Sequence, residues 1–186
     1  MVRPVWMKTV HRLAPLMTLL VVLAACGGSG SKEPGFGLID YPDSPGEISA
    51  QPGDFAPNFR LELAGGGEIE LAEEFGTPIL LNFFASWCTN CREEMAALEA
   101  VDGQDVQVIG VNFQENDEKV LALAEETGAS FAMALDRNGK VSREYRATSL
   151  PVTLVIGADG QVIEYIKGPV DEAMLADILA GLANAD

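Results

Sequence analysis

The sequence predicts an α/β domain organised around one mixed β-sheet. Apolar runs of strand length alternate with stretches of helical periodicity between residues 79 and 146, as in consecutive strand–helix units. The run Ile79–Ala85 is almost continuously apolar, which is typical of a central strand buried on both faces. A strand–turn–strand–helix succession over residues 152–183 completes the pattern.

The first elements are a predicted hairpin and the central strand. Phe59–Leu63 and Glu68–Leu71 have strand character on either side of Gly65-Gly66-Gly67, so they should pair as a hairpin. The central strand at Ile79–Ala85 follows. A helix is then expected from Arg92 to about Val101.

The remaining elements continue this alternation and end in a second hairpin and a helix. In order, they are a strand at Val106–Asn112, a helix at Glu118–Thr127, a strand at Phe131–Leu135, a short helix at Lys140–Arg146, and paired strands at Val152–Ile156 and Val162–Ile166. Gly128 should stop the second helix, and Asp171 can cap a last helix that runs to about Ala183.

Residues 1–25 have the pattern of a secretory signal. Basic residues precede an apolar stretch of about a dozen residues, which is shorter than the ~20 that a membrane-spanning helix needs. The sequence Leu23-Ala24-Ala25-Cys26 resembles a bacterial lipobox, in which the cysteine receives lipid after cleavage. We therefore expect an extracytoplasmic lipoprotein anchored at Cys26, either periplasmic or on the outer face of the cytoplasmic membrane. An ordinary signal peptide with a chance cysteine is the alternative.

Residues 26–53 are rich in Gly, Ser and Pro, so they should form a flexible tether ahead of the domain at residues 54–186. The tether contains a few apolar residues that could instead dock on the domain: Phe36, Leu38, Ile39 and Tyr41. The domain itself is long enough to bury a full hydrophobic core.

Charge and composition exclude several function classes. Removal of residues 1–25 would take away three basic residues and change the formal net charge from −16 to −19, so nucleic acid would be repelled. The single histidine, His11, lies in that segment, which excludes His-based catalytic pairs and His-ligated metals in the mature chain. Besides Cys26, only Cys88 and Cys91 remain, too few for a Cys₄ zinc site. No metal or other cofactor is expected.

Cys88 and Cys91 are the expected catalytic pair. Two cysteines separated by two residues at a strand-to-helix junction can close a disulfide and reopen as a dithiol. A helix N-terminus directs unpaired N–H groups at the first sulfur and favours its thiolate. Cys88 is therefore the predicted nucleophile, and Cys91 the more buried resolving cysteine. The alternatives are a permanent disulfide staple, which would stabilise by only about 2 kcal/mol across so short a loop, and a Cu(I) site.

The segment Leu81–Met95, LNFFASWCTNCREEM, resembles the active-site segment of the TlpA/ResA-like thioredoxins, which are membrane-tethered thiol–disulfide oxidoreductases. The likeness extends from about Asp54 to Asp186 and includes the segments Val108–Asn112 and Ser149–Ile156. It implies a thioredoxin-like fold with a mixed central sheet flanked by helices, an N-terminal β-hairpin and a helical insertion after the second motif strand.

The resemblance also implies supporting roles for four residues. The Leu150–Pro151 bond should be cis and face the cysteine pair, so that Leu150 presents its backbone to an extended client chain. Trp87 should shield the site, unless it is an ordinary core aromatic. Glu94 matches a glutamate of ResA-like members, and our hypothesis is that it relays the proton that Cys91 exchanges; a solvated surface residue is the alternative.

Three positions qualify the resemblance. Thr89-Asn90 stands between the cysteines where Gly-Pro or Glu-Pro is usual, and this pair tunes the reduction potential. Asn82 occupies the position of a buried aspartate in thioredoxin, and an asparagine cannot carry the proton. Thr153 matches a threonine often found after the proline, although a β-branched strand residue needs no functional explanation.

The sequence thus predicts an exported enzyme that reduces disulfides of extracytoplasmic client proteins, such as apocytochrome c or another thiol protein. It would draw electrons from a membrane partner, because the exported compartment lacks a cytosolic thioredoxin supply. A reductant is favoured over an oxidant since no histidine lies between the cysteines. The alternatives are a peroxiredoxin-like peroxidase, although no Pro-x-x-x-Thr-x-x-Cys motif is present, and a noncatalytic binding lipoprotein.

Overall fold

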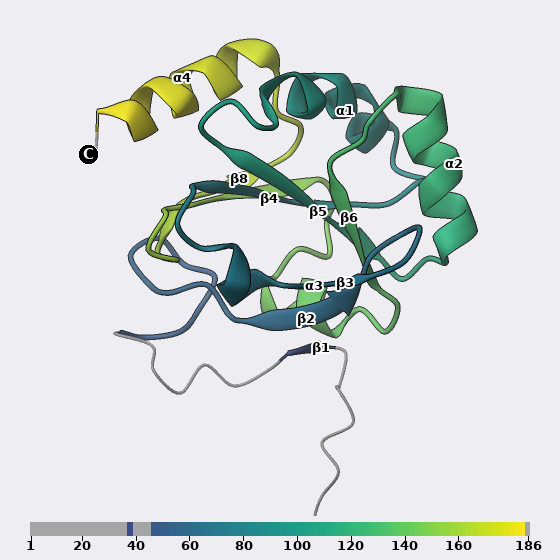
Figure 1. Cartoon of the computed structure of the whole chain (residues 1–186), viewed down its shortest axis with the longest axis horizontal. Helices are drawn as coiled ribbons and strands as arrows, with labels where there is room; N and C mark the ends of the chain where they lie inside the picture. Colours follow the sequence, from purple (N-terminus) through teal and green to yellow (C-terminus); the bar gives the residue numbers. More distant parts are fainter. Residues whose placement is uncertain (1–36, 39–45, 185–186) are drawn as a thin grey trace, which may run out of the picture. The chain divides into compact units, whose positions relative to one another are not determined.

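The computed structural model describes Gly37–Leu38 and residues 46–184 (Figure 1). A central sheet contains five strands: β4 (Ile79–Phe84), β5 (Gln107–Phe113), β6 (Ala132–Asp136), β7 (Val152–Ile156) and β8 (Val162–Lys167). Their order across the sheet is β6-β5-β4-β7-β8. Strand β4 is parallel to β5 and antiparallel to β7, so the sheet is mixed as the sequence predicts.

The other elements surround this sheet. A smaller sheet consists of β1 (Gly37–Leu38), β2 (Phe59–Glu62) and β3 (Glu68–Glu70). The helices are η1 (Leu71–Glu74), α1 (Thr89–Val101), α2 (Asp117–Thr127), α3 (Lys140–Glu144) and α4 (Glu172–Ala183). Figure 1 shows α1, α2 and α4 on one side of the central sheet, with α3 and the β2–β3 hairpin on the other. Among the described residues, no helix is long and apolar enough to cross a membrane.

Strand β4 separates the two halves of the core. All six of its residues are buried, which is why its sequence is almost continuously apolar. Because side chains alternate across a strand, Leu81 and Phe83 pack in the cluster that contains the hairpin residue Phe59. Leu80 and Phe84 pack in the cluster that contains Met95 of α1. Asn82 lies two residues after Leu80 and therefore faces the same side of the sheet, so a buried polar side chain lies in the apolar, helix-covered half of the core.

Parts of the N-terminal half differ from the prediction. The predicted hairpin forms a separate sheet with β1, which was not predicted as a strand, and it reaches the edge strand β6 through the bridge Leu63–Ala134. Residues 46–53 of the predicted tether instead contact the domain: Gly53 N–H donates to Val162 O at 2.8 Å, and Ala50 is only 3% exposed. Leu38 lies in β1, which pairs with β2. Cys26, Phe36, Ile39 and Tyr41 lie outside the described residues.

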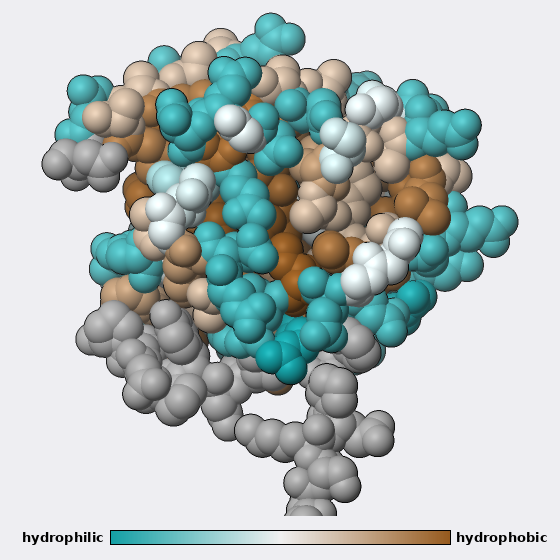
Figure 2. All heavy atoms as spheres, in the orientation of Figure 1, coloured by the Kyte–Doolittle hydropathy of each residue, from teal (hydrophilic) through white to brown (hydrophobic). Residues whose placement is uncertain are grey.

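The first helix also begins earlier than predicted, at Thr89 instead of Arg92, because Cys88 serves as its N-cap. Thr and Asn are weak helix formers in the interior of a helix, but the first turn tolerates them. The short elements β1 and η1 were not predicted, whereas the strands and helices other than α1 lie within about two residues of their predicted bounds. Figure 2 shows hydrophilic residues over much of the surface on this side, with apolar residues visible between them.

Gly110 in β5 leaves room for the ring of Phe84, the residue that ends the neighbouring strand β4. A Cβ at position 110 would lie 2.8 Å from Phe84 Cε1 and 3.1 Å from Phe131 Cε2. We therefore expect Gly110→Ala to destabilise the fold by about 1–3 kcal/mol through overpacking, measured by urea denaturation. The control is Gly181→Ala in α4, where no heavy atom lies within 4 Å and helix propensity should stabilise by up to about 1 kcal/mol. Equal unfolding midpoints for the two variants would contradict this account.

Candidate active site

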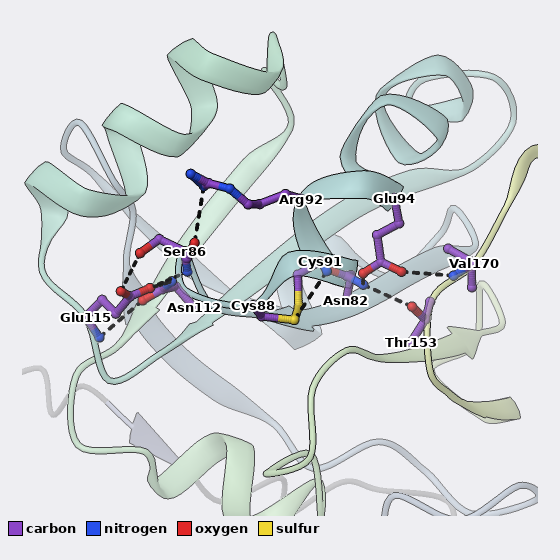
Figure 3. The surroundings of a disulfide bond; sticks show 10 residues. All are labelled: Asn82, Ser86, Cys88, Cys91, Arg92, Glu94, Asn112, Glu115, Thr153 and Val170. Atoms are coloured by element: carbon purple, nitrogen blue, oxygen red, sulfur yellow. Dashed lines mark hydrogen bonds between the residues drawn. A yellow bond between two sulfur atoms is a disulfide. The ribbon is translucent and has the colours of Figure 1, made fainter.

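Cys88 and Cys91 form a disulfide at the N-terminus of α1, with their Cα atoms 5.3 Å apart (Figure 3). Cys88 is the N-cap of the helix, and its Sγ accepts a hydrogen bond from Cys91 N–H at 3.2 Å. Cys88 is 8% exposed and Cys91 is fully buried. The pair therefore lies at the predicted strand-to-helix junction, and Cys88 is the less buried of the two residues.

Charged side chains hold the segment just before Cys88. The N–H and Oγ–H of Ser86 both donate to the Glu115 carboxylate, each at 2.6 Å. Arg92 of α1 donates to Ser86 O at 3.2 Å, so the same residue is held from the helix as well. This arrangement fixes the loop between β4 and α1 and thereby the position of Cys88.

Glu115 is a site residue that the sequence did not reveal. It follows β5, whose carboxyl end adjoins that of the parallel strand β4, and only this adjacency could have indicated it. Burial raises the pKa of Glu115, but hydrogen bonds from Asn112 and Ser86, together with Lys119 at 3.8 Å, outweigh burial and hold the pKa below its usual value. Glu115 is therefore a charged anchor.

Glu94 lies in the buried interior at 2% exposure, which excludes the alternative of a solvated surface residue. One turn of α1 beyond Cys91, its Oε1 accepts from Asn82 Nδ2 at 2.8 Å and its Oε2 from Val170 N–H at 2.9 Å. Burial raises the pKa of Glu94 to about 7, although both hydrogen bonds oppose this. Such a carboxyl exchanges its proton near neutral pH, as a proton relay requires.

The other predicted site residues differ in exposure. The Leu150–Pro151 peptide bond is cis, as the resemblance implied. Leu150 is half-buried and contacts both core clusters. Trp87 is 64% exposed, which excludes the role of a core aromatic. Thr153 of β7 is buried and accepts a hydrogen bond from Asn82 Nδ2 at 3.0 Å. The shielding role of Trp87 and the client-presenting role of Leu150 stay predictions.

Exchange of a disulfide for a dithiol needs one reachable sulfur and a second sulfur close enough to bond with it. The start of α1 holds two sulfurs close enough to bond, beside a mixed sheet as the sequence predicts. Fold and site together define the class of thioredoxin-like thiol–disulfide oxidoreductases.

Comparison with known proteins gives the family. The AhpC/TSA family matches residues 52–165. Thiol-disulfide oxidoreductase ResA of Bacillus subtilis (strain 168) is 31% identical over 138 residues, which cover 72% of this chain and 77% of that protein. ResA of Halalkalibacterium halodurans is 32% identical over 134 residues, or 70% of this chain and 76% of that protein. The chain therefore belongs to the AhpC/TSA family and, within it, to the ResA-like thiol–disulfide oxidoreductases.

Solved structures agree with this assignment. A protein of Chlorobium tepidum assigned as the thiol:disulfide interchange protein DsbE has a TM-score of 0.64 at 28% identity, and the match covers 71% of this chain and 98% of that one. A protein of Bacteroides thetaiotaomicron assigned as a protein disulfide isomerase also has a TM-score of 0.64, at 26% identity, over 80% of this chain and 91% of that one.

Glu94 should make stability depend on pH. Because its pKa rises from 4.5 to about 7 on folding, the folded protein binds this proton more tightly than the unfolded chain does. Stability from this group is present below about pH 4.5 and is lost as the pH rises through about 7, by about 3 kcal/mol in total. Glu94→Gln lacks the titration, so its stability relative to wild type should improve by about that amount from pH 4.5 to pH 8, measured by denaturant unfolding of the oxidised protein.

Glu115→Gln is the matched control, since it also replaces a buried carboxylate beside an asparagine. The pKa of Glu115 is lowered, so its contribution is present at neutral pH and is lost as the pH falls. Glu115→Gln should therefore be more destabilising at neutral pH than in acid, the opposite trend to Glu94→Gln. The same trend in both variants would contradict the two assigned environments.

Proposed function

We propose that this oxidoreductase is exported, anchored to the membrane by lipid on Cys26, and reduces disulfides in extracytoplasmic client proteins. The observation that carries the redox part is the Cys88–Cys91 disulfide at a helix N-terminus, with Cys88 the more exposed sulfur. The signal-like residues 1–25 and the lipobox-like sequence before Cys26 support the location.

The reaction begins with the reduced pair. The Cys88 thiolate attacks one sulfur of the client disulfide, so that a Cys88–client bond forms, the client S–S bond breaks, and one client thiolate leaves. The Cys91 thiolate then attacks Cys88 Sγ, which closes the Cys88–Cys91 disulfide and releases the second client sulfur. Two electrons pass from the enzyme dithiol to the client. A membrane electron donor would return the pair to its dithiol form.

The surroundings of the pair support the roles given to their side chains. Cys91 must lose its proton before it attacks, and Glu94 lies one turn along α1 with a pKa of about 7, suited to accept it. Trp87 is exposed and directly precedes Cys88 in the sequence. Leu150 precedes the cis-proline, in the segment that leads into β7. These residues offer the client an apolar surface and, at Leu150, backbone groups for pairing with an extended chain.

Cys91→Ser should trap a client that Cys88 has attacked, because the resolving sulfur is missing. The expected result is a mixed disulfide that dissociates on reduction, seen on non-reducing gels after expression in the native host. Cys88→Ser is the control and should trap no client, since the buried Cys91 cannot be reached. An equal yield of mixed disulfide from both variants would refute the assigned order of attack.

Two assays on the same proteins separate the alternatives. Wild type should reduce insulin disulfides when a dithiol is supplied, and Cys88→Ser should lose that turnover by at least about 100-fold. Peroxide consumption that depends on Cys88 and exceeds insulin reduction would favour the peroxidase. A Cys88→Ser strain with the wild-type phenotype would favour the noncatalytic binding lipoprotein.

The lipid anchor is tested at Cys26. Cells fed a labelled fatty acid should produce a labelled wild-type protein in the membrane fraction, and Cys26→Ser should lose both the label and membrane retention. Cys88→Ser serves as the control because it removes a thiol without altering the lipobox-like sequence. Label that persists in Cys26→Ser would overturn the proposed anchor.

A further inference from the structure

The Asn82 side-chain amide donates hydrogen bonds to two buried oxygens, while its own oxygen has no hydrogen-bond partner among the described residues. Its Nδ2 donates one hydrogen to Glu94 Oε1 at 2.8 Å and the other to Thr153 Oγ1 at 3.0 Å (Figure 3). Both donors are therefore used. Its Oδ1 is buried and has no hydrogen-bond partner among the described residues. An unpaired buried acceptor is costly and requires an explanation.

The hydrogen bonds around Glu94 suit its charged form better than its neutral form. Asn82 faces one carboxylate oxygen with an N–H, and Val170 faces the other with an N–H. The neutral acid carries an O–H donor of its own, and neither of these two N–H groups can accept a hydrogen bond from it. The neutral acid would therefore gain from an acceptor that neither group offers in this orientation.

Rotation of the Asn82 amide by about 180° supplies that arrangement, because it exchanges Oδ1 with Nδ2. The carboxamide oxygen has two lone pairs, so it can accept from a protonated Glu94 Oε1 and from the Thr153 hydroxyl. The hydroxyl reverses its role from acceptor to donor. Each state makes two hydrogen bonds at Asn82: the first leaves the Oδ1 acceptor without a partner, and the turned state leaves the NH₂ group without one. The two states differ by a single proton.

We propose that Asn82 is the positioning residue for the Glu94 proton: its side-chain amide turns over when that proton arrives or leaves, with the Thr153 hydroxyl as its partner. The use of this device in catalysis rests on the proposed function, in which Glu94 exchanges a proton with Cys91. Asn82 would offer a donor to the Glu94 carboxylate and an acceptor to the neutral acid.

Other charges around Glu94 are engaged elsewhere. Strands β4 and β7 contribute no ionisable side chain. The charged neighbours on α1 and at the start of α4 are Arg92, Glu93, Glu99, Asp171 and Glu172. Arg92 pairs with Glu126, Glu99 accepts from Ser130, Asp171 caps α4, and Glu93 and Glu172 are exposed. Within the described residues Glu94 has no ion pair, so the amide is the group that must respond to its charge.

The protein contains a matched asparagine–glutamate pair that should not turn over. Asn112 Nδ2 donates to Glu115 Oε2 at 2.9 Å, while Asn112 Oδ1 accepts from Glu115 N–H at 3.2 Å. Both ends of this amide are therefore fixed, and rotation would break two hydrogen bonds. Hydrogen bonds and Lys119 also keep Glu115 charged at neutral pH.

The direct test is a pH titration of the oxidised full-length chain in detergent, followed by NMR. From about pH 5 to about pH 9, the side-chain amide resonances of Asn82 should shift with the same midpoint as the Glu94 carboxyl carbon, whereas those of Asn112 stay constant. Asn82 resonances that stay constant while Glu94 titrates would overturn the proposal. This measurement uses the wild-type protein, so it does not depend on whether a variant folds.

Glu94→Gln provides a second test. Val170 N–H requires the glutamine oxygen, so the glutamine NH₂ must face Asn82 and accept no hydrogen from it. Asn82 should then be held in the turned state, with resonances that match the acid form of wild type at every pH. Resonances that match the alkaline form would overturn the proposal.

Failure of this inference can be told from failure of the proposed function. The rate of thiol–disulfide exchange against pH in Glu94→Gln tests the relay, and an unaltered profile would remove the relay. An Asn82 amide that ignores the Glu94 titration, in a protein whose exchange profile does depend on Glu94, would remove only the amide turnover.

Discussion

The junction between β4 and α1 is the constraint on which the site depends. Cys88 must end the loop that leaves the sheet and also cap the helix, so its sulfur lies where the first N–H groups of α1 converge. Because β4 is buried on both faces and cannot shift, the start of the helix is fixed relative to the core. The adjoining clamp of Ser86 by Glu115 and Arg92 removes the freedom that the loop would otherwise have.

Two buried carboxylates near this junction show how environment separates their chemistry. Each accepts a hydrogen bond from an asparagine, yet the pKa of Glu94 is raised and that of Glu115 is lowered. Glu115 receives three hydrogen bonds and has a lysine nearby, whereas Glu94 receives two and is more deeply buried. Glu115 therefore holds the loop as a group that is charged at neutral pH, and Glu94 can carry a proton.

The family assignment and the physical reading of the residues agree. The resemblance of residues 81–95 indicated the fold, and the sheet order β6-β5-β4-β7-β8 follows from the pairing of strands in the structure. The membership among ResA-like oxidoreductases establishes the reaction class. The client, the electron donor and the lipid anchor are proposals that rest on the reactive pair and on the signal-like N-terminus.

The sequence by itself determined the order of strands and helices, because hydrophobic periodicity and turn residues are local properties of the chain. It also determined the reactive pair, since Cys88 and Cys91 are three residues apart and need only one helical turn to meet. It did not reveal Glu115, which reaches Ser86 across 29 residues of sequence, or the contact of Asn82 with Thr153 across 71. It also left open whether Glu94 was solvated. Only the tertiary structure decided these points, because burial and long-range hydrogen bonds depend on which elements pack together and not on the residue types alone.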